Sequence, residues 1–216
     1  MTELSFAAWR VRAGKAAPAV LRSAALAAAL GLAACGGGDN PLTNPPNVTN
    51  AAGTTGQKLS FAYFQRCINP ILLAQLQSNI NGVVSTNTCA SAGCHENANG
   101  PGGAFRVIAS AQPIDLANAA NTPDVIRASD MYKNFYSAQG SVALGSPSDS
   151  RLVTKPLVRG VLHGGGLIFA SDQDANVRLM QYWISRPAPQ GQDEFSLATY
   201  SLFTPPDPAT GTCNTQ

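Results

Sequence analysis

The segment Cys89-Ala-Ser-Ala-Gly-Cys94-His95 constrains this chain more than any other, because it gathers two of the five cysteines and one of the two histidines. Cysteines spaced in this way close a disulfide loop, attach a haem group whose iron the histidine binds, or join the histidine in a zinc site. A zinc site needs a fourth ligand, and His163 has no partner nearby in the sequence, unlike the paired ligands of structural zinc sites. The residues leave the disulfide and the haem open.

Residues 1–34 are typical of a bacterial secretory signal. Basic residues precede an apolar run at 24–34. That run is too short to span a bilayer, which needs about 20 residues, and fits the apolar part of an export signal. Leu32-Ala33-Ala34-Cys35 then resembles a lipobox, in which the cysteine is lipidated and becomes the mature N-terminus. We therefore expect a lipoprotein-type signal peptide over residues 1–34 and a lipid anchor on Cys35, because several acyl chains give durable attachment.

Composition separates a tether from one folded domain. Residues 35–57 are rich in Gly, Asn and Pro and lack apolar periodicity, which indicates a flexible tether. Residues 58–216 are expected to form a single domain. The formal net charge of the chain is +2, so no basic field is available to neutralise nucleic-acid phosphates, and nucleic acid is excluded as a partner. By resemblance to enteric-type sorting, Gly36 in place of Asp favours the outer membrane, with the domain facing the periplasm.

Apolar periodicity predicts three helices within this domain. The first, a helix or kinked helix pair, places Phe61, Phe64 and Ile68 on one face. The second begins where a threonine that can cap it is followed by proline, and the third ends at Pro187. No clear strand alternation is present, so the passage at 79–88 is interpreted as polar and turn-rich. The expected helices cover residues 59–79, 122–136 and 172–186.

A histidine directly after the second of two cysteines is typical of haem attachment, because both thiols add to haem vinyl groups and the imidazole binds the iron. The usual motif is C-x-x-C-H, whereas the spacing here is C-x-x-x-x-C-H, a rarer form known in some multihaem cytochromes. The chain also resembles periplasmic c-type cytochromes over most of residues 58–190. The resemblance implies a mostly α, cytochrome c-like helical domain with long loop insertions, one of them between Pro70 and Cys89. The segments that carry it are 64–73, 150–157, 163–166 and the 172–186 helix.

This resemblance implies a role for each residue of the motif. Cys89 and Cys94 would attach haem c covalently, and His95 would be the proximal ligand of its iron. His163, which precedes three glycines in a loop that is also His-Gly-Gly in the related sequences, would be the distal ligand. The alternative distal ligands are Met180 and Met131, although methionines on the apolar face of a helix more often fill the core.

The resemblance also concerns the two remaining cysteines. With Cys35 lipidated and Cys89 and Cys94 holding haem, Cys67 and Cys213 are left in an oxidising compartment. Cytochrome c-like folds cross their N- and C-terminal helices, which implies that a cysteine on the first helix meets one in the tail. We therefore predict a Cys67–Cys213 disulfide, and the alternative is that these thiols are unpaired or differently paired.

These expectations combine into one predicted function. A membrane-tethered c-type cytochrome with one haem would transfer single electrons in the bacterial cell envelope, exchanging them with a redox partner protein that the sequence does not identify. Such a protein is an electron carrier more readily than an enzyme. The alternatives are a haem-free, disulfide-stapled lipoprotein with a binding or structural role and, third, an enzyme that uses a five-coordinate haem.

Overall fold

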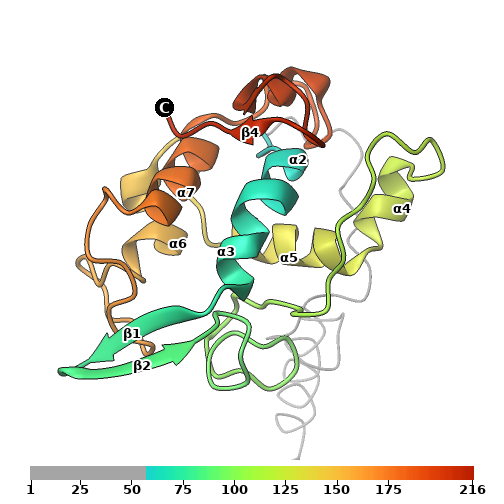
Figure 1. The fold of residues 1–216 in the computed structure, drawn as a ribbon. Helices are drawn as coiled ribbons and strands as arrows, with labels where there is room; N and C mark the ends of the chain where they lie inside the picture. The colour runs from blue at the N-terminus through green and yellow to red at the C-terminus, as the bar shows by residue number, and fades with distance from the viewer. Residues whose placement is uncertain (1–56) are drawn as a thin grey trace, which may run out of the picture. The chain divides into compact units, whose positions relative to one another are not determined.

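A computed structural model describes residues 57–216, and the predicted signal peptide, the lipidation site at Cys35 and nearly all of the tether lie outside them. Figure 1 shows the first helical segment at the centre of this domain, with the C-terminal segment at one end and a β-hairpin at the other. The helical elements are α2 (Phe61–Tyr63), η1 (Phe64–Ile68), α3 (Asn69–Leu73), α4 (Pro123–Arg127), α5 (Asp130–Gln139), η2 (Pro147–Asp149), α6 (Arg151–Thr154), α7 (Ala175–Ser185) and η3 (Leu197–Leu202). The strands are β1 (Leu76–Ile80), β2 (Val83–Asn87), β3 (Phe203–Thr204) and β4 (Thr212–Cys213).

The expectation of a mostly α, cytochrome c-like helical domain is wrong. Helices account for 32% of the described residues, strands account for 11%, and the strands form two small antiparallel sheets, β1–β2 and β3–β4. Much of the domain is loop, because the chain is rich in Gly, Asn, Ser and Pro, residues that favour turns over regular helix. The interpretation of residues 79–88 as an irregular passage is also wrong, since most of them belong to the β1–β2 hairpin.

The first helix runs from α2 through η1 to α3 and ends at Leu73, earlier than expected. Ser60 caps its start, because its hydroxyl accepts a hydrogen bond from the Tyr63 amide. Its middle part, η1, is a π-helical turn in which the Asn69 amide donates to the Phe64 carbonyl. The wider turn directly precedes Pro70, which has no amide proton and whose ring would crowd a regular helix.

Aromatic side chains join the first helix to α5 and α7 in the core. Phe61, Phe64 and Ile68 are all fully buried, which confirms the predicted apolar face. Phe64 contacts Phe135 of α5 and Trp183 of α7, with ring centroids 5.5 Å apart in both pairs, a typical spacing for packed aromatic rings. Trp183 also donates its indole N–H to the Ser60 carbonyl, so the ring is anchored as well as buried.

The predicted helix at 122–136 is two helices, α4 and α5. Thr122 caps α4 as expected, with its side chain accepting from the Val125 amide. Ser129 then adopts an extended conformation and caps α5 by accepting from the Tyr132 amide. A second N-cap residue within the predicted helix therefore divides it. The third helix is confirmed as α7, which begins after Asp174 and ends at Ser185.

The β1–β2 hairpin turns at Asn81 and Gly82, whose φ angles are +52° and +87°. Two positive φ angles in a two-residue loop match the twist of paired strands, and Asn-Gly is the residue pair that best adopts them. The strands pair in register from Leu76 opposite Asn87 to Ile80 opposite Val83. This hairpin occupies the stretch between Pro70 and Cys89, and β2 leads directly into the cysteine–histidine loop.

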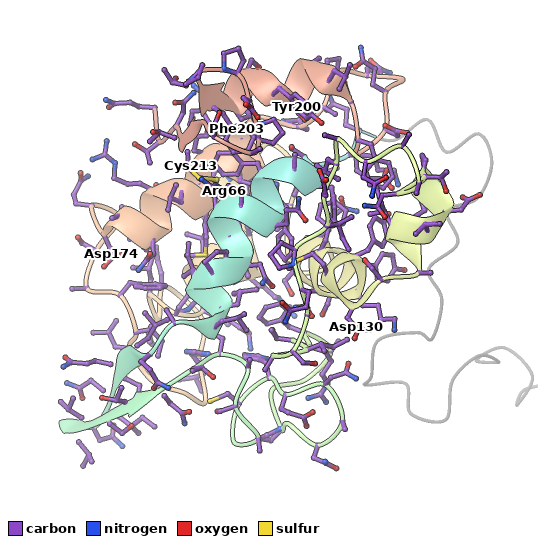
Figure 2. All side chains as sticks on the ribbon, turned by 45° about the vertical axis from the view of Figure 1, so that its right-hand side comes forward. Arg66, Asp130, Asp174, Tyr200, Phe203 and Cys213 are labelled. Carbon is purple, nitrogen blue, oxygen red and sulfur yellow. A yellow bond between two sulfur atoms is a disulfide. The ribbon has the colours of Figure 1, made fainter. Side chains whose placement is uncertain are left out.

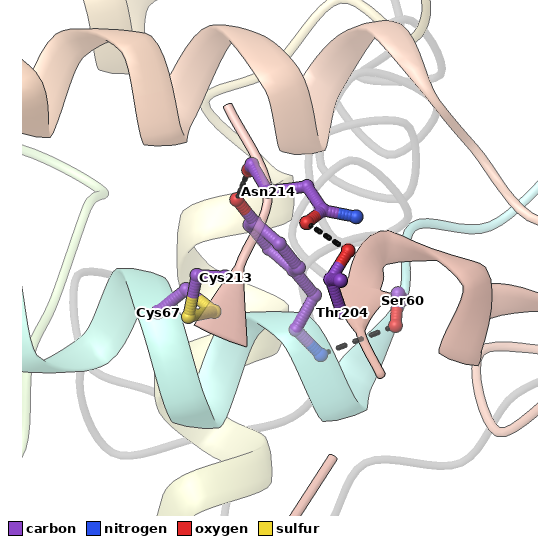
Figure 3. Close-up of a disulfide and its surroundings, with 6 residues drawn as sticks. Ser60, Cys67, Thr204, Cys213 and Asn214 are labelled. Atoms are coloured by element: carbon purple, nitrogen blue, oxygen red, sulfur yellow. Dashed lines mark hydrogen bonds between the residues drawn. A yellow bond between two sulfur atoms is a disulfide. The ribbon is translucent and has the colours of Figure 1, made fainter. Parts of the chain in front are cut away.

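A disulfide joins Cys67 of the first helix to Cys213 of β4, as predicted. Tyr63 donates its hydroxyl proton to the Asn214 carbonyl beside this bond, and Thr204 donates to the Asn214 side chain (Figure 3). Figure 2 shows Phe203 and Cys213 on the C-terminal segment where it meets the first helix. The tail is therefore fixed to the core at the end of the domain opposite the hairpin.

No helix in residues 57–216 is long and apolar enough to cross a membrane.

Candidate functional site

The loop at 88–95 folds back on itself, so that the long spacing between the cysteines still brings Cys89 beside His95. The His95 amide donates to the Cys89 carbonyl over 2.9 Å, and the Cys94 amide donates to the Ser91 carbonyl over 2.9 Å. The Ala90 amide donates to the Leu72 carbonyl, which ties this loop to the end of the first helix. The two additional residues of the motif are therefore accommodated in a turn.

Both thiols of the motif are free and half-buried in this structure. Burial and, to a smaller extent, the neighbouring Cys94 raise the pKa of Cys89 to about 11, although a backbone hydrogen bond opposes the shift. Cys89 is therefore a protonated thiol near neutral pH, and a protonated thiol is a poor nucleophile for disulfide exchange. Among the described cysteines, Cys67 and Cys213 form the disulfide, and the Cys89 and Cys94 thiols are free.

The His95 imidazole is held by the loop that follows it. Its Nδ1 lies 3.0 Å from the Phe105 carbonyl oxygen, and the Phe105 ring lies 4.7 Å from the imidazole, centroid to centroid. A carbonyl only accepts, so Nδ1 carries the proton and Nε2 keeps the lone pair that binds a metal. A side chain at Gly102 would not fit, because its Cβ would lie 2.2 Å from Nδ1. Burial lowers the pKa of His95, which keeps the ring neutral, although the hydrogen bond to Phe105 opposes this shift.

Residues 96–107 support this imidazole through the backbone. The Val107 amide donates to the His95 carbonyl over 2.7 Å, and the Gly102 amide donates to the Cys94 carbonyl over 2.8 Å. The buried Arg106 guanidinium donates to the Gly100 carbonyl and, over 3.4 Å, to the Glu96 carbonyl. The loop therefore closes around a buried cation and fixes the backbone on either side of His95. The sequence motif alone assigned no role to this segment.

His163 lies in a tight turn of its own. Its Nδ1 lies 2.8 Å from the Gly166 carbonyl oxygen, and the Gly166 amide donates back to the His163 carbonyl over 2.8 Å. As at His95, the proton is on Nδ1, and Nε2 is the nitrogen that can bind a metal. Metal-binding histidines in proteins commonly donate their other N–H to a carbonyl in this way.

The two imidazoles lie close together, although His95 and His163 are 68 positions apart in the chain. Their centroids are 6.3 Å apart, and their planes are within 13° of parallel. An imidazole nitrogen binds a transition metal at about 2.0 Å, and the centre of such a ring lies about 1.1 Å from its atoms, given bonds of about 1.35 Å. Two imidazoles on opposite sides of one metal ion therefore have centroids about 6 to 6.5 Å apart. The observed separation of 6.3 Å falls in this range, so His95 and His163 are the residues that could hold such an ion between them.

The two methionines considered as alternative ligands are core residues. Met131 and Met180 are each 1% exposed and belong to the hydrophobic core, one on α5 and one on α7. No group of three or more His, Cys, Asp or Glu side chains within residues 57–216 is arranged to hold a metal ion. The four-ligand zinc site considered from the sequence is therefore not formed in this part of the chain.

Comparisons with known proteins give no relative. No family model matches the chain, and neither a curated protein nor a solved structure is similar to it.

Proposed function

We propose that residues 58–216 carry one haem c, attached through Cys89 and Cys94, and that the protein transfers single electrons. The observation that carries this proposal is the pair of near-parallel imidazoles of His95 and His163, 6.3 Å apart, each with Nδ1 on a backbone carbonyl. Two free thiols directly before the first histidine support it, because they supply the covalent attachment. The proposal concerns the cofactor and its chemistry and does not depend on a cytochrome c-like fold.

Each residue of the site has a distinct task. The Cys89 and Cys94 thiols would each add across one vinyl group, with the thiol hydrogen going to the neighbouring carbon, so that attachment would need no oxidant. His95 and His163 would hold the iron through their Nε2 atoms. The haem would supply one-electron redox chemistry. With both histidines holding the iron, the site would favour electron transfer over substrate binding.

The test is the fate of haem in matched cysteine variants of the full chain, produced in a bacterial host with haem maturation machinery. The wild-type protein should be red and should keep its haem through acid–acetone extraction. The Cys89→Ala/Cys94→Ala variant should lose covalent haem, whereas Cys67→Ala/Cys213→Ala removes as many thiols and should keep it. A colourless wild-type protein, or haem that is extracted from all three proteins, would refute the proposal.

We also propose that the protein is a lipoprotein of the bacterial envelope, anchored through Cys35 to the outer membrane and facing the periplasm. The lipobox at residues 32–35 and the Gly-rich stretch behind it support this proposal. Replacing Cys35 with Ser should move the protein from the membrane fraction to the soluble fraction. If Cys35→Ser leaves the protein in the membrane with its signal cleaved normally, the anchor is not on Cys35.

A further inference from the structure

The turn that carries His163 is attached to the free edge of the β1–β2 hairpin. The Asn79 amide donates to the Leu167 carbonyl over 2.9 Å, and the Leu167 amide donates to the Asn79 carbonyl over 2.9 Å. This pair of bonds is an antiparallel bridge, so Asn79 pairs with Leu167 on one side and with Val84 of β2 on the other. Leu167, four residues after His163, is therefore joined to the outer edge of β1 by a single bridge.

The same hairpin is continuous with the loop that carries the other imidazole. Strand β2 ends at Asn87, two residues before Cys89, and the Cys89 carbonyl accepts from the His95 amide. One strand of the hairpin thus fixes the His163 turn, and the other leads into the His95 loop. The two loops are therefore linked through one rigid, hydrogen-bonded element.

Gly166 makes this attachment possible. Its φ angle is +73°, in the region that residues with a Cβ rarely adopt. A Cβ at this position would lie 2.2 Å from the Asn79 carbonyl oxygen and 2.7 Å from Cγ1 of Ile80. Any side chain here must push the turn away from the hairpin, and the Gly166 carbonyl that holds the His163 ring moves with it.

We propose that the β1–β2 hairpin sets the distance between the two imidazoles and that Gly166 is the positioning residue that fixes His163 to it. This inference rests on the proposed haem ligation. The hairpin acts through backbone hydrogen bonds, so its role is to hold the His163 ring in place and not to contact the iron. The segment that the sequence marked as an insertion is then the element on which the distal ligand depends.

The experiment compares Gly166→Ala with Gly164→Ala in the haem-loaded full chain. Gly164 lies in the same turn, a Cβ there would meet nothing within 4 Å, and it is the matched control. Gly166→Ala should show a high-spin ferric fraction and should bind added imidazole at a concentration about tenfold lower than the wild-type protein does, because His163 no longer competes as well. Gly164→Ala should match the wild-type protein in both measurements.

A second variant covers the case in which Gly166→Ala does not fold. Gly82→Val strains the hairpin turn at φ +87° without meeting any atom within 4 Å at its Cβ, so it loosens the hairpin far from the imidazole. It should raise the high-spin fraction in the same direction by a smaller amount. Wild-type spectra and imidazole affinity in Gly166→Ala, or in Gly82→Val if the first is not produced, would overturn the inference. A wild-type protein without haem would instead refute the proposed function.

Discussion

The Cys67–Cys213 disulfide should contribute a large part of the stability of the domain, because it closes almost the whole folded chain into one loop. The sequence separation of the two cysteines is 146. In the chain-entropy description, a loop of that length destabilises the unfolded state by about 5 kcal/mol. For a chain of this size, about 1 kcal/mol corresponds to a change of about 2 to 4 °C in Tm, so the loss should lower Tm by about 10 to 20 °C.

Guanidinium denaturation followed by far-UV circular dichroism measures this loss in Cys67→Ala, in Cys213→Ala and in the double variant. Either single change removes the same bond, so all three variants should lose about the same stability, with the double variant within about 0.5 kcal/mol of the singles. Thr212→Ala, an exposed neighbour on β4, is the control and should change stability by less than about 0.5 kcal/mol. A loss below about 1 kcal/mol in the double variant, or single effects that add, would refute the reasoning.

Three further predictions follow from individual contacts. Gly102→Ala should lower the yield of haem-loaded protein or give a mixed-spin spectrum, because its Cβ would lie 2.2 Å from the proximal imidazole, whereas Gly93→Ala, in open space within the same motif, should have no effect on either readout. Met131→Leu and Met180→Leu should leave the ferric absorption spectrum unchanged, since both residues are buried in the core and the swaps conserve volume; a changed spectrum would indicate methionine ligation. Burial raises the pKa of Tyr63, so above pH about 10 the folded chain keeps a proton that the unfolded chain loses. The stability measured by denaturation should therefore fall as the pH rises above about 10, and it should fall less in Tyr63→Phe.

The parts of the fold that sequence patterns predicted are those set by local side-chain chemistry. The apolar face of the first helix and the start of the helix at Thr122 depend on residue spacing and on one capping hydroxyl, which a sequence displays directly. The second helix is divided at Ser129, which is also a capping residue. The apolar periodicity continues on both sides of Ser129, so it predicts one helix where there are two. Asn81-Gly82 is the residue pair typical of a two-residue hairpin turn. The resemblance to helical cytochromes predicts no hairpin at this position.

The geometry of the site was less accessible from sequence. Cys89, Cys94 and His95 form a local sequence motif. The distance between His95 and His163, in contrast, depends on backbone hydrogen bonds between residues far apart in the chain. The Asn79–Leu167 bridge and the hydrogen bond between His95 and the Phe105 carbonyl are made by backbone groups, which are the same at every position. Only Gly102 and Gly166 reflect them in the sequence, and a glycine does not reveal which backbone it approaches. The predicted fold class was wrong because the expected helices are shorter or divided, and long loops and two small sheets make up much of the rest of the domain.

The most direct test of the proposed haem attachment is the mass of one tryptic peptide from the purified wild-type protein. Cleavage after Arg66 and after Arg106 releases residues 67–106, which contain both thiols of the motif and the adjacent histidine. Under reducing, denaturing conditions this peptide should be heavier by one haem, with fragmentation locating the added mass between Cys89 and Cys94. An unmodified peptide, or one that before reduction contains a Cys89–Cys94 disulfide, would contradict the account.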